Sequence, residues 1–425
     1  MQNLGLNLYL LFVASWFLHL PARLPFLALI RADLVLVAML AALAFVGRAT
    51  EARARTTIDK WIVVLFAYVL LASPLTEWPG SVLKSGIPNF IKAVVFFYFT
   101  VAFIKTEKDL TKFIVVFLGC QLFRILEPLY LHVTQGYWGS SASQMGGTEF
   151  LDRLAGSPFD VVNPNGLAFV VLTVLPLLYF MQSLSWKHRV AFLTLTPLCL
   201  YALALTGSRS GIVGLVAVFL AIVVESKRRF LLISAGMVAM IAGFAYLSPD
   251  QQDRYLSIVG MGEKNATTAD ERLSGLQEDL NVALRRPLFG YGLGTSAEAN
   301  ANFATAGPYA RRELPAHNLY VEVLVELGIV GTVVYLLFLK SVFRGFLQCR
   351  RTFRSKESRP FLRQLFAAVQ VWLVVSFITS FGTYGLSTDE WYLLAGLSIV
   401  LQRLVEAGSP AGVASTPQVG VLAAR

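Results

Sequence analysis

The sequence predicts an all-α polytopic membrane protein of about 12 transmembrane helices. Of its 425 residues, 56% are hydrophobic and only 15% are charged, and the apolar residues form long uninterrupted runs. A helix of about 20 apolar residues spans the hydrocarbon core of a bilayer and satisfies its backbone hydrogen bonds internally. These runs are therefore typical of membrane spans, whereas a water-soluble core would need amphipathic or alternating patterns.

The apolar runs define the order of the predicted spans. We expect spans at residues 4–20, 25–46, 60–73, 88–104, 112–132, 165–183, 190–206, 211–225, 230–247, 317–340, 363–381 and 389–405. The first run lacks both a basic region before it and a small-residue cleavage site followed by a soluble sequence, so we predict that it is retained as a span. Residues 1–408 then form a single transmembrane domain, and the Ala-, Gly-, Pro- and Ser-rich residues 409–425 are predicted to be a disordered cytoplasmic tail.

Basic residues predict the orientation of these spans. The net charge is +10, and 20 of the 36 Lys and Arg residues fall in five clusters, at residues 48–60, 105–112, 187–189, 227–229 and 340–363. The clusters occupy alternate loops, which by the positive-inside rule places both termini in the cytoplasm and indicates membrane topology rather than nucleic-acid binding. Two longer segments then face outward, residues 133–164 and the large periplasmic loop, residues 248–316. Function is expected on this outer face.

The motifs of several enzyme classes are missing from the sequence. We find no Walker or dinucleotide-binding glycine pattern, no H-E-x-x-H, no G-x-S-x-G and no D-x-D motif on the outer loops. The three cysteines, Cys120, Cys199 and Cys349, predict neither a disulfide framework nor a metal-ligand cluster. We therefore expect no nucleotide-sugar donor, no obligatory metal and no cofactor.

The large loop contains a predicted helix with clear end signals. Thr268 and Glu271 have the spacing of a capping box, leucines recur at helical intervals, and the helix ends before Pro287 and the three glycines that follow it. The apolar stripe favours a helix lying on the membrane or on the bundle. Arg272 falls in the first turn, where the helix dipole disfavours a cation unless an anion is close.

Ionisable residues in the outer halves of the spans are candidates for function, because buried charges are costly in a membrane. Together these residues could line an outward-opening cavity that carries positive charge. Alternatively, each cation reaches the lipid headgroups or pairs with a neighbouring acid, as Arg31 could with Asp33 and Arg124 with Glu127. These residues are Arg31, Asp33, Lys92, Arg124 and Glu127.

Arg209 and His317 have more distinctive surroundings. Arg209 lies in the turn "TGSRSG", whose small residues allow close approach of a ligand or a helix, and a tight turn would need the glycines but not the arginine. Its planar guanidinium suits phosphate oxygens. His317 lies at the outer mouth of a span, where an imidazole could act as a general base toward a hydroxyl or, alternatively, serve as an interfacial or helix-capping residue.

Three segments together resemble the O-antigen ligase and polymerase superfamily of bacterial inner-membrane proteins. They are "RLAGSPFDVVNPNGLA" at residues 153–168, "TGSRSG" at 206–211, and "ERLSGLQEDLNVALRRPLFGYGLG" followed by "AHNLYVEVLVELGIVG" within 271–331. The resemblance implies a metal-independent, inverting glycosyltransferase of the membrane-embedded GT-C type. Such enzymes transfer a glycan from undecaprenyl pyrophosphate to an acceptor hydroxyl on the periplasmic face.

The resemblance also implies roles for individual residues. The arginines of the family match Arg153, Arg209 and Arg272, and its histidine matches His317. Arg209 and Arg272 would bind the pyrophosphate and stabilise its developing charge, with Arg286 as a competitor for the role of Arg272. His317 would deprotonate or orient the acceptor hydroxyl. The stretch 163–165, including Asn165, and the stretch 207–211 would be scaffold, and Glu326 is expected to pack within its span.

Four functions remain open on the sequence alone. A ligase would use the lipid A core as acceptor, a polymerase another repeat unit, and a protein O-oligosaccharyltransferase a protein. We favour the ligase because the chain shows no additional C-terminal periplasmic domain. A lipid-oligosaccharide flippase would carry charges through the full membrane thickness and have two related halves, which this sequence does not show.

Overall fold

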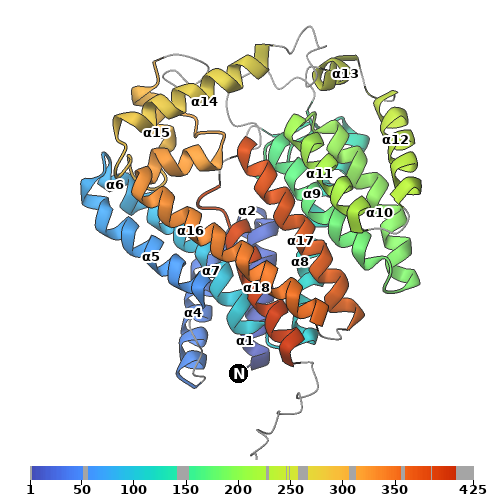
Figure 1. Cartoon of the computed structure of the whole chain (residues 1–425), viewed down its shortest axis with the longest axis horizontal. Helices are drawn as coiled ribbons and strands as arrows, with labels where there is room; N and C mark the ends of the chain where they lie inside the picture. Colours follow the sequence, from blue (N-terminus) through green and yellow to red (C-terminus); the bar gives the residue numbers. More distant parts are fainter. Residues whose placement is uncertain are drawn as a thin grey trace, which may run out of the picture.

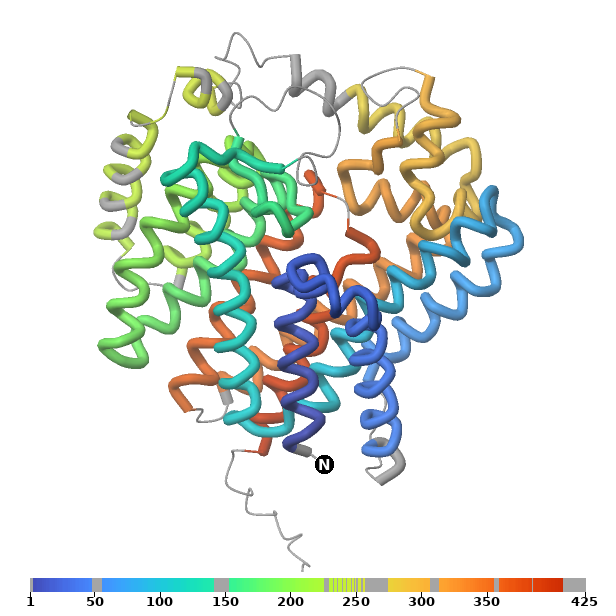
Figure 2. Tube along the Cα trace, turned by 180° about the vertical axis from the view of Figure 1, so that it is seen from behind, coloured from blue at the N-terminus to red at the C-terminus, as the bar shows by residue number. Residues whose placement is uncertain are grey.

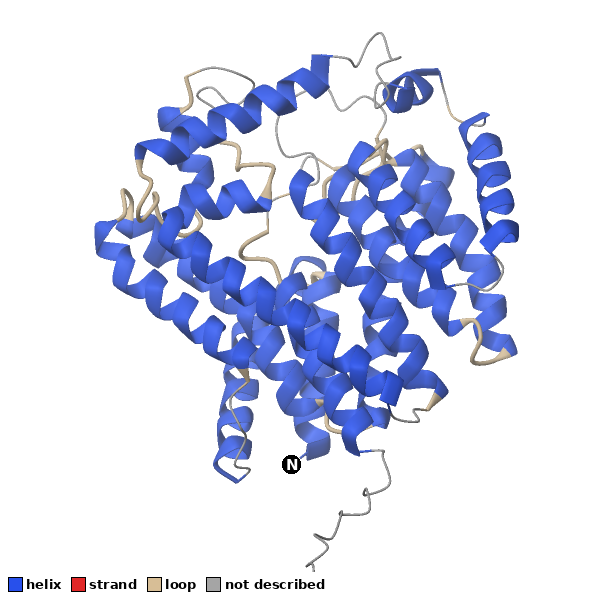
Figure 3. Cartoon of the chain, in the orientation of Figure 1, coloured by secondary structure: helices blue, strands red, loops and turns tan. Residues whose placement is uncertain are grey.

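The fold is helical throughout the part of the chain that the structure describes (Figure 3). This structure is a computed structural model; it describes residues 2–407 except 51–55, 141–152, 226–228, 246, 248, 257–266, 306–312, 356–358 and 384. The predicted tail, 409–425, lies outside the described residues. An all-α architecture is confirmed, and the division into a single transmembrane domain stays a prediction.

Seven helical stretches of the described residues are long and apolar enough to cross a membrane, by length and composition: Thr57–Leu75, Pro79–Phe103, Glu107–Gln135, Pro164–Met181, Trp186–Leu205, Leu319–Arg354 and Pro360–Gly382. The apolar stretches within α1, α4, α11 and α12 are shorter. The seven stretches correspond to α5 (Thr57–Ala72), α7 (Ile87–Phe103), α8 (Glu107–Gln135), α9 (Pro164–Met181), α10 (Trp186–Leu205), α16 (Leu319–Ser355) and α17 (Pro360–Thr379), and the stretches of α5, α7 and α17 also include adjoining short helical turns. The others are α1 (Gln2–Leu18), α2 (Leu20–Arg23), α3 (Pro25–Leu29), α4 (Ala32–Thr50), α6 (Pro79–Ser81), α11 (Arg209–Glu225), α12 (Arg229–Ala245), α13 (Pro249–Leu256), α14 (Thr267–Arg285), α15 (Ser296–Phe303) and α18 (Glu390–Ala407).

The core of the bundle is built around α18. This helix is apolar around most of its circumference, as a helix must be when neighbours surround it. It packs on α7, α16 and α17, and Trp391 and Tyr392 in its first turn are completely enclosed. Tyr392 stacks on Phe338 of α16 and meets Phe90 of α7 edge-on. The buried aromatic residues therefore join helices that are far apart in the sequence.

Two predicted spans are broken in the structure. Residues 25–46 form α3 and α4, separated at Arg31, whose φ of 48° lies in the left-handed region. The predicted span 317–340 is part of the longer α16, which is interrupted at Gly328 with φ 63° and ψ −170°. Continuous apolar sequence carries no signal for either break, because each depends on backbone conformation and on contacts made elsewhere.

The large loop lies at the end of the bundle opposite the N-terminus (Figures 1 and 2). Its predicted helix is confirmed as α14, and Pro287 and the glycine-rich run follow it. Gly290, Gly292 and Gly294 all have positive φ, between 69° and 122°, so the run cannot continue a helix. The proposed capping pair, Thr268 and Glu271, lies outside the described side chains.

Candidate functional site

The turn of residues 206–211 is fixed by its own side chains. Gly207 takes φ 55°, and the Ser208 hydroxyl accepts a hydrogen bond from the Gly211 amide at 3.1 Å, which makes Ser208 the N-cap of α11. Arg209 is therefore the first residue of α11, and its side chain is buried, with 8% exposed. The positive end of the helix dipole disfavours a cation at this position. The guanidinium and the first amides of α11 together form an electropositive corner suited to an anion.

Arg153 and Asn165 hold this turn from the preceding segment. Arg153 donates from Nε to the Thr206 carbonyl at 2.8 Å and from Nη2 to Asn165 Oδ1 at 2.9 Å. The same Asn165 oxygen accepts a hydrogen bond from the Ser208 hydroxyl at 2.9 Å. The Leu154 amide also donates to the Leu205 carbonyl at 2.9 Å. The structure thus brings Arg153, Asn165 and the turn together and gives Arg153 and Asn165 a positioning geometry.

Arg124 of α8 pairs with Asp160, which lies between Arg153 and the start of α9. Its Nε and Nη2 donate to the two Asp160 carboxylate oxygens at 2.7 and 3.2 Å, and both side chains are buried. Glu127, the partner considered from sequence, pairs with Arg23. Arg124 is therefore paired with an acid, as one of the two alternatives expected, but the acid is Asp160, 36 residues away, and not Glu127.

Arg31 and Lys92 lie on exposed surface. Arg31 occupies the break between α3 and α4, while Asp33 accepts a hydrogen bond from Ser15 Oγ at 2.5 Å. Lys92 donates to Asn89 at 3.4 Å on the same helix. A substrate-binding role for Arg31 stays a prediction.

The glycine-rich run of the large loop, residues 287–294, docks on the break in α16. The Tyr291 and Gly292 amides donate to the Val325 and Glu326 carbonyls at 2.9 and 2.8 Å, and the Ile329 amide donates to the Pro287 carbonyl at 2.7 Å. These bonds use backbone groups that the interrupted helix leaves without helical partners. The large loop is therefore joined by main-chain hydrogen bonds to α16, which begins just after His317.

Glu326 strengthens this junction with its side chain. It is 2% exposed, and its two carboxylate oxygens accept the Gly294 amide at 2.7 Å and the Ser296 amide at 3.3 Å. The carboxylate thereby caps the N-terminus of α15, where the helix dipole favours an anion. The expectation that Glu326 packs within its span omitted this contact with the loop. A glutamate within an apolar run was the available signal.

The two arginines considered for the large loop differ in what the structure shows. Arg286 pairs with Glu77 at 2.5 Å and also donates to the Leu75 carbonyl at 3.3 Å. Arg272 lies in the first turn of α14, and its side chain falls outside the described part of the chain. Arg286 thus links the loop to the segment after α5, and the assignment of Arg272 stays a prediction.

His317 is exposed and lies two residues before the start of α16. The cap of α16 is Asn318, whose Oδ1 accepts the Tyr320 and Val321 amides at 3.0 and 3.3 Å. The helix-capping role considered for His317 is therefore filled by its neighbour. Because Asn318 fixes the start of α16, it also fixes the backbone position next to it, from which the His317 imidazole extends.

Residues 380–383 and 385–386, which follow α17, contact the Arg209 turn and α16, respectively. Glu322 on α16 accepts the Gly385 and Leu386 amides at 2.7 and 3.2 Å. At Gly382, a Cβ atom would be only 3.5 Å from the Cβ of Ser210, next to Arg209. Sequence reasoning missed this segment because its role depends on contacts with two distant elements. The buried guanidinium of Arg209 at a helix N-terminus suits anion binding, and the exposed imidazole of His317 is a group that can transfer a proton.

No group of three or more His, Cys, Asp and Glu side chains that could hold a metal occurs among the residues the structure describes. The three cysteines are buried and free.

Comparison with known families matches residues 193–336 to a family model described as O-antigen ligase. This range contains the Arg209 turn, α14, the glycine-rich run and His317. No curated protein matches the chain.

Proposed function

We propose that this chain, which carries an O-antigen ligase domain over residues 193–336, is a membrane glycosyltransferase that completes lipopolysaccharide. The donor is an O-antigen polysaccharide on undecaprenyl pyrophosphate, and the acceptor is a hydroxyl of the lipid A core oligosaccharide. The protein resides in the bacterial inner membrane among its lipids, with the site facing the periplasm. Nucleic acid has no part in this function.

The buried Arg209 at the first position of α11 is the observation that carries the proposal. The guanidinium and the first amides of α11 place positive charge together at this helix N-terminus, where both would stabilise a bound anion. Arg153 and Asn165 fix the turn, so the electropositive corner exists before the donor arrives. Preorganised charge of this kind stabilises a leaving pyrophosphate more effectively than a flexible side chain does.

In the proposed reaction, His317 accepts the proton of the acceptor hydroxyl, and the hydroxyl oxygen attacks the anomeric carbon from the face opposite the pyrophosphate. The bond from that carbon to the pyrophosphate oxygen breaks, so the configuration inverts and undecaprenyl pyrophosphate leaves. Arg209, with Arg272 from α14, neutralises the charge that develops on the leaving oxygen. We propose that these arginines serve in place of a metal ion.

Site variants in a strain that lacks the endogenous protein test this assignment. Substituting alanine for Arg209, Arg272 or His317 is expected to abolish long lipopolysaccharide on gels while the protein still inserts. Arg209→Lys should fail as well, because an ammonium cannot reproduce the planar fork. Lys84→Ala is the matched control, since Lys84 is an exposed cation in the helical turn Val82–Gly86. Normal ladders from all three alanine variants would overturn the assignment.

The glycan left on the carrier in a deletion strain separates ligase from polymerase. Long polymers stranded on undecaprenyl pyrophosphate support the ligase, whereas single repeat units support an O-antigen or exopolysaccharide polymerase. Normal lipopolysaccharide with loss of protein glycans would indicate a protein O-oligosaccharyltransferase. Glycan retained on the cytoplasmic face of the membrane would instead support the hypothesis that the protein is a lipid-oligosaccharide flippase.

A further inference from the structure

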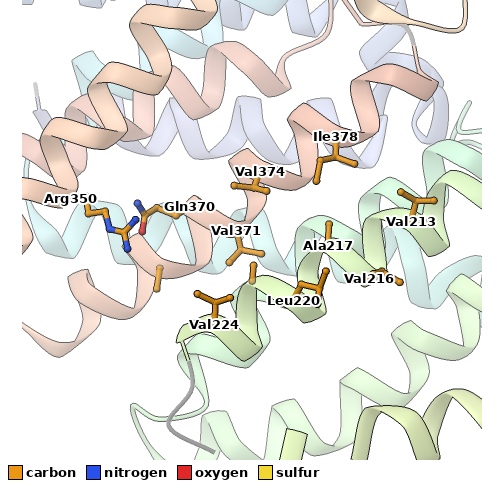
Figure 4. Close-up of a pocket in the computed structure, with 12 residues that line it drawn as sticks. Val213, Val216, Ala217, Leu220, Val224, Arg350, Gln370, Val371, Val374 and Ile378 are labelled. Atoms are coloured by element: carbon orange, nitrogen blue, oxygen red, sulfur yellow. The ribbon is translucent and has the colours of Figure 1, made fainter. Parts of the chain in front are cut away.

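A groove between α11 and α17 opens on the outside of the bundle and begins at Val213, about one helical turn after Arg209. It encloses about 550 Å³, within the range of small-molecule sites. Its walls are aliphatic, and several of these side chains are strongly exposed (Figure 4); they include Val213, Leu220 and Val224 of α11 and Val374 of α17. In a membrane protein such a surface faces hydrocarbon, so the occupant must have an apolar part.

Polar groups line only one end of the groove. Gln370 of α17 and Arg350 of α16 lie together at the end away from Val213 and Ile378 (Figure 4). This end lies near the α16–α17 connection, where Arg351, Arg354, Arg359 and Arg363 follow in sequence. The positive-inside rule places such a basic connection in the cytoplasm. An amphiphile in the groove would therefore place an anionic headgroup at the cytoplasmic surface.

At the opposite end of the groove, α11 and α17 are in close contact. A Cβ on Gly214 of α11 would lie 2.3 Å from Cδ1 of Leu172 on α9 and 3.1 Å from Cγ2 of Thr379 on α17. The groove therefore has polar groups at one end and tightly packed helices at the other.

The length of the groove fits one membrane leaflet. Val213 and Val224 are 11 residues apart on α11, which corresponds to about 16 Å at 1.5 Å per residue. Half of a typical hydrocarbon core is about 15 Å. An acyl chain of a single leaflet matches this length, whereas a long polyprenyl chain would extend beyond it.

We propose that the groove binds an anionic glycerophospholipid of the cytoplasmic leaflet, with one acyl chain between α11 and α17 and the phosphate at Arg350. Arginine binds phosphate oxygens through charge-assisted hydrogen bonds, and Gln370 offers an amide donor beside it. The bound lipid fills the space between two helices, one of which begins at Arg209. This site differs from the proposed donor site in location, headgroup and leaflet.

Lipid retention by the purified full-length chain tests the site. The protein in detergent is mixed with equal amounts of phosphatidylglycerol and phosphatidylcholine, purified again, and its retained lipid is counted by mass spectrometry. The wild type should retain about one phosphatidylglycerol per chain. Arg350→Gln should lower that retention about tenfold, the expected effect of losing a charge-assisted hydrogen bond. Leu220→Trp should fill the groove and lower retention of both lipids.

Two matched variants control for general effects. Arg351→Gln removes the adjacent arginine, which does not line the groove, and Leu193→Trp adds the same bulk to an exposed site on α10. Both should retain lipid as the wild type does. Equal retention of the two lipids by the wild type, or wild-type retention by Arg350→Gln, would overturn the proposal. Displacement of the phosphatidylglycerol by polyprenyl diphosphate would assign the groove to the donor chain and overturn it as well.

Discussion

Replacing Glu326 with alanine is expected to release the large loop from α16. In the wild type, the buried carboxylate accepts the Gly294 and Ser296 amides, at 2.7 and 3.3 Å. Ser296 is buried, and a buried donor left without a partner costs about 1–3 kcal/mol, whereas the amide of the exposed Gly294 can bond to water. Because each 1.4 kcal/mol changes an equilibrium tenfold, even the lower figure raises the opened population about fivefold.

Hydrogen exchange of the amides in residues 287–296 measures this opening directly, since exchange follows the free energy of local unfolding. Glu326→Ala should speed exchange in this segment by at least about fivefold, and Glu326→Gln, which keeps one acceptor oxygen, should fall between it and the wild type. Glu313→Ala removes an exposed glutamate of the same loop and should leave exchange unchanged. If Glu326→Ala exchanged like Glu313→Ala, the anchoring role of Glu326 would be wrong.

Three further predictions follow from other contacts. Gly328→Ala places a Cβ 2.4 Å from the Leu288 carbonyl oxygen on a residue with φ 63°, so thermal unfolding should show that the protein loses at least about 1–3 kcal/mol of stability. Gly80→Ala, whose Cβ would meet open space, should lose far less stability. Equal losses of stability in the two variants would contradict the steric explanation. Arg153 holds the Arg209 turn through two hydrogen bonds, to the Thr206 carbonyl and to Asn165. Arg153→Ala and Arg153→Lys should therefore both displace the turn and lower glycan transfer about a hundredfold, while both variants stay stable enough to purify. Near-normal transfer by Arg153→Lys would show that the two hydrogen bonds are not required. Burial, with a smaller contribution from Glu278, raises the pKa of Asp279 to about 6 despite its hydrogen bond from Asn300. The folded state therefore holds the proton more tightly, and stability should fall by about 3 kcal/mol as pH rises from about 4 to 6, a slope that Asp279→Asn should remove in thermal unfolding measured against pH.

Local sequence predicted the helices well because apolar length alone determines them. The spans predicted at 165–183 and 190–206 correspond to α9 and α10, Pro164–Met181 and Trp186–Leu205. The breaks at Arg31 and Gly328 were missed, since a left-handed residue inside an apolar run leaves no periodic signal. The helix of the large loop was predicted correctly because Pro287 and the glycines define its end.

The candidate site was predictable where its residues are neighbours in sequence. The turn around Arg209 was predicted from its own sequence, but the hydrogen bond that holds it joins Arg153 to Thr206, 53 residues away. Glu127 was considered for Arg124 because it lies one helical turn away, whereas Asp160 reaches Arg124 through a loop that no local pattern predicts. Long-range pairing of this kind depends on the packing of whole helices.

Donor binding by Arg209 variants tests the central claim most directly. Purified protein is titrated with radiolabelled undecaprenyl pyrophosphate, and the dissociation constants of the wild type, Arg209→Gln and Lys84→Gln are compared. Loss of a charge-assisted hydrogen bond to phosphate is worth about 1.5–3 kcal/mol, so Arg209→Gln should bind about 10–100 times more weakly, while Lys84→Gln binds as the wild type. Wild-type affinity in Arg209→Gln would contradict the assignment of the electropositive corner to the pyrophosphate.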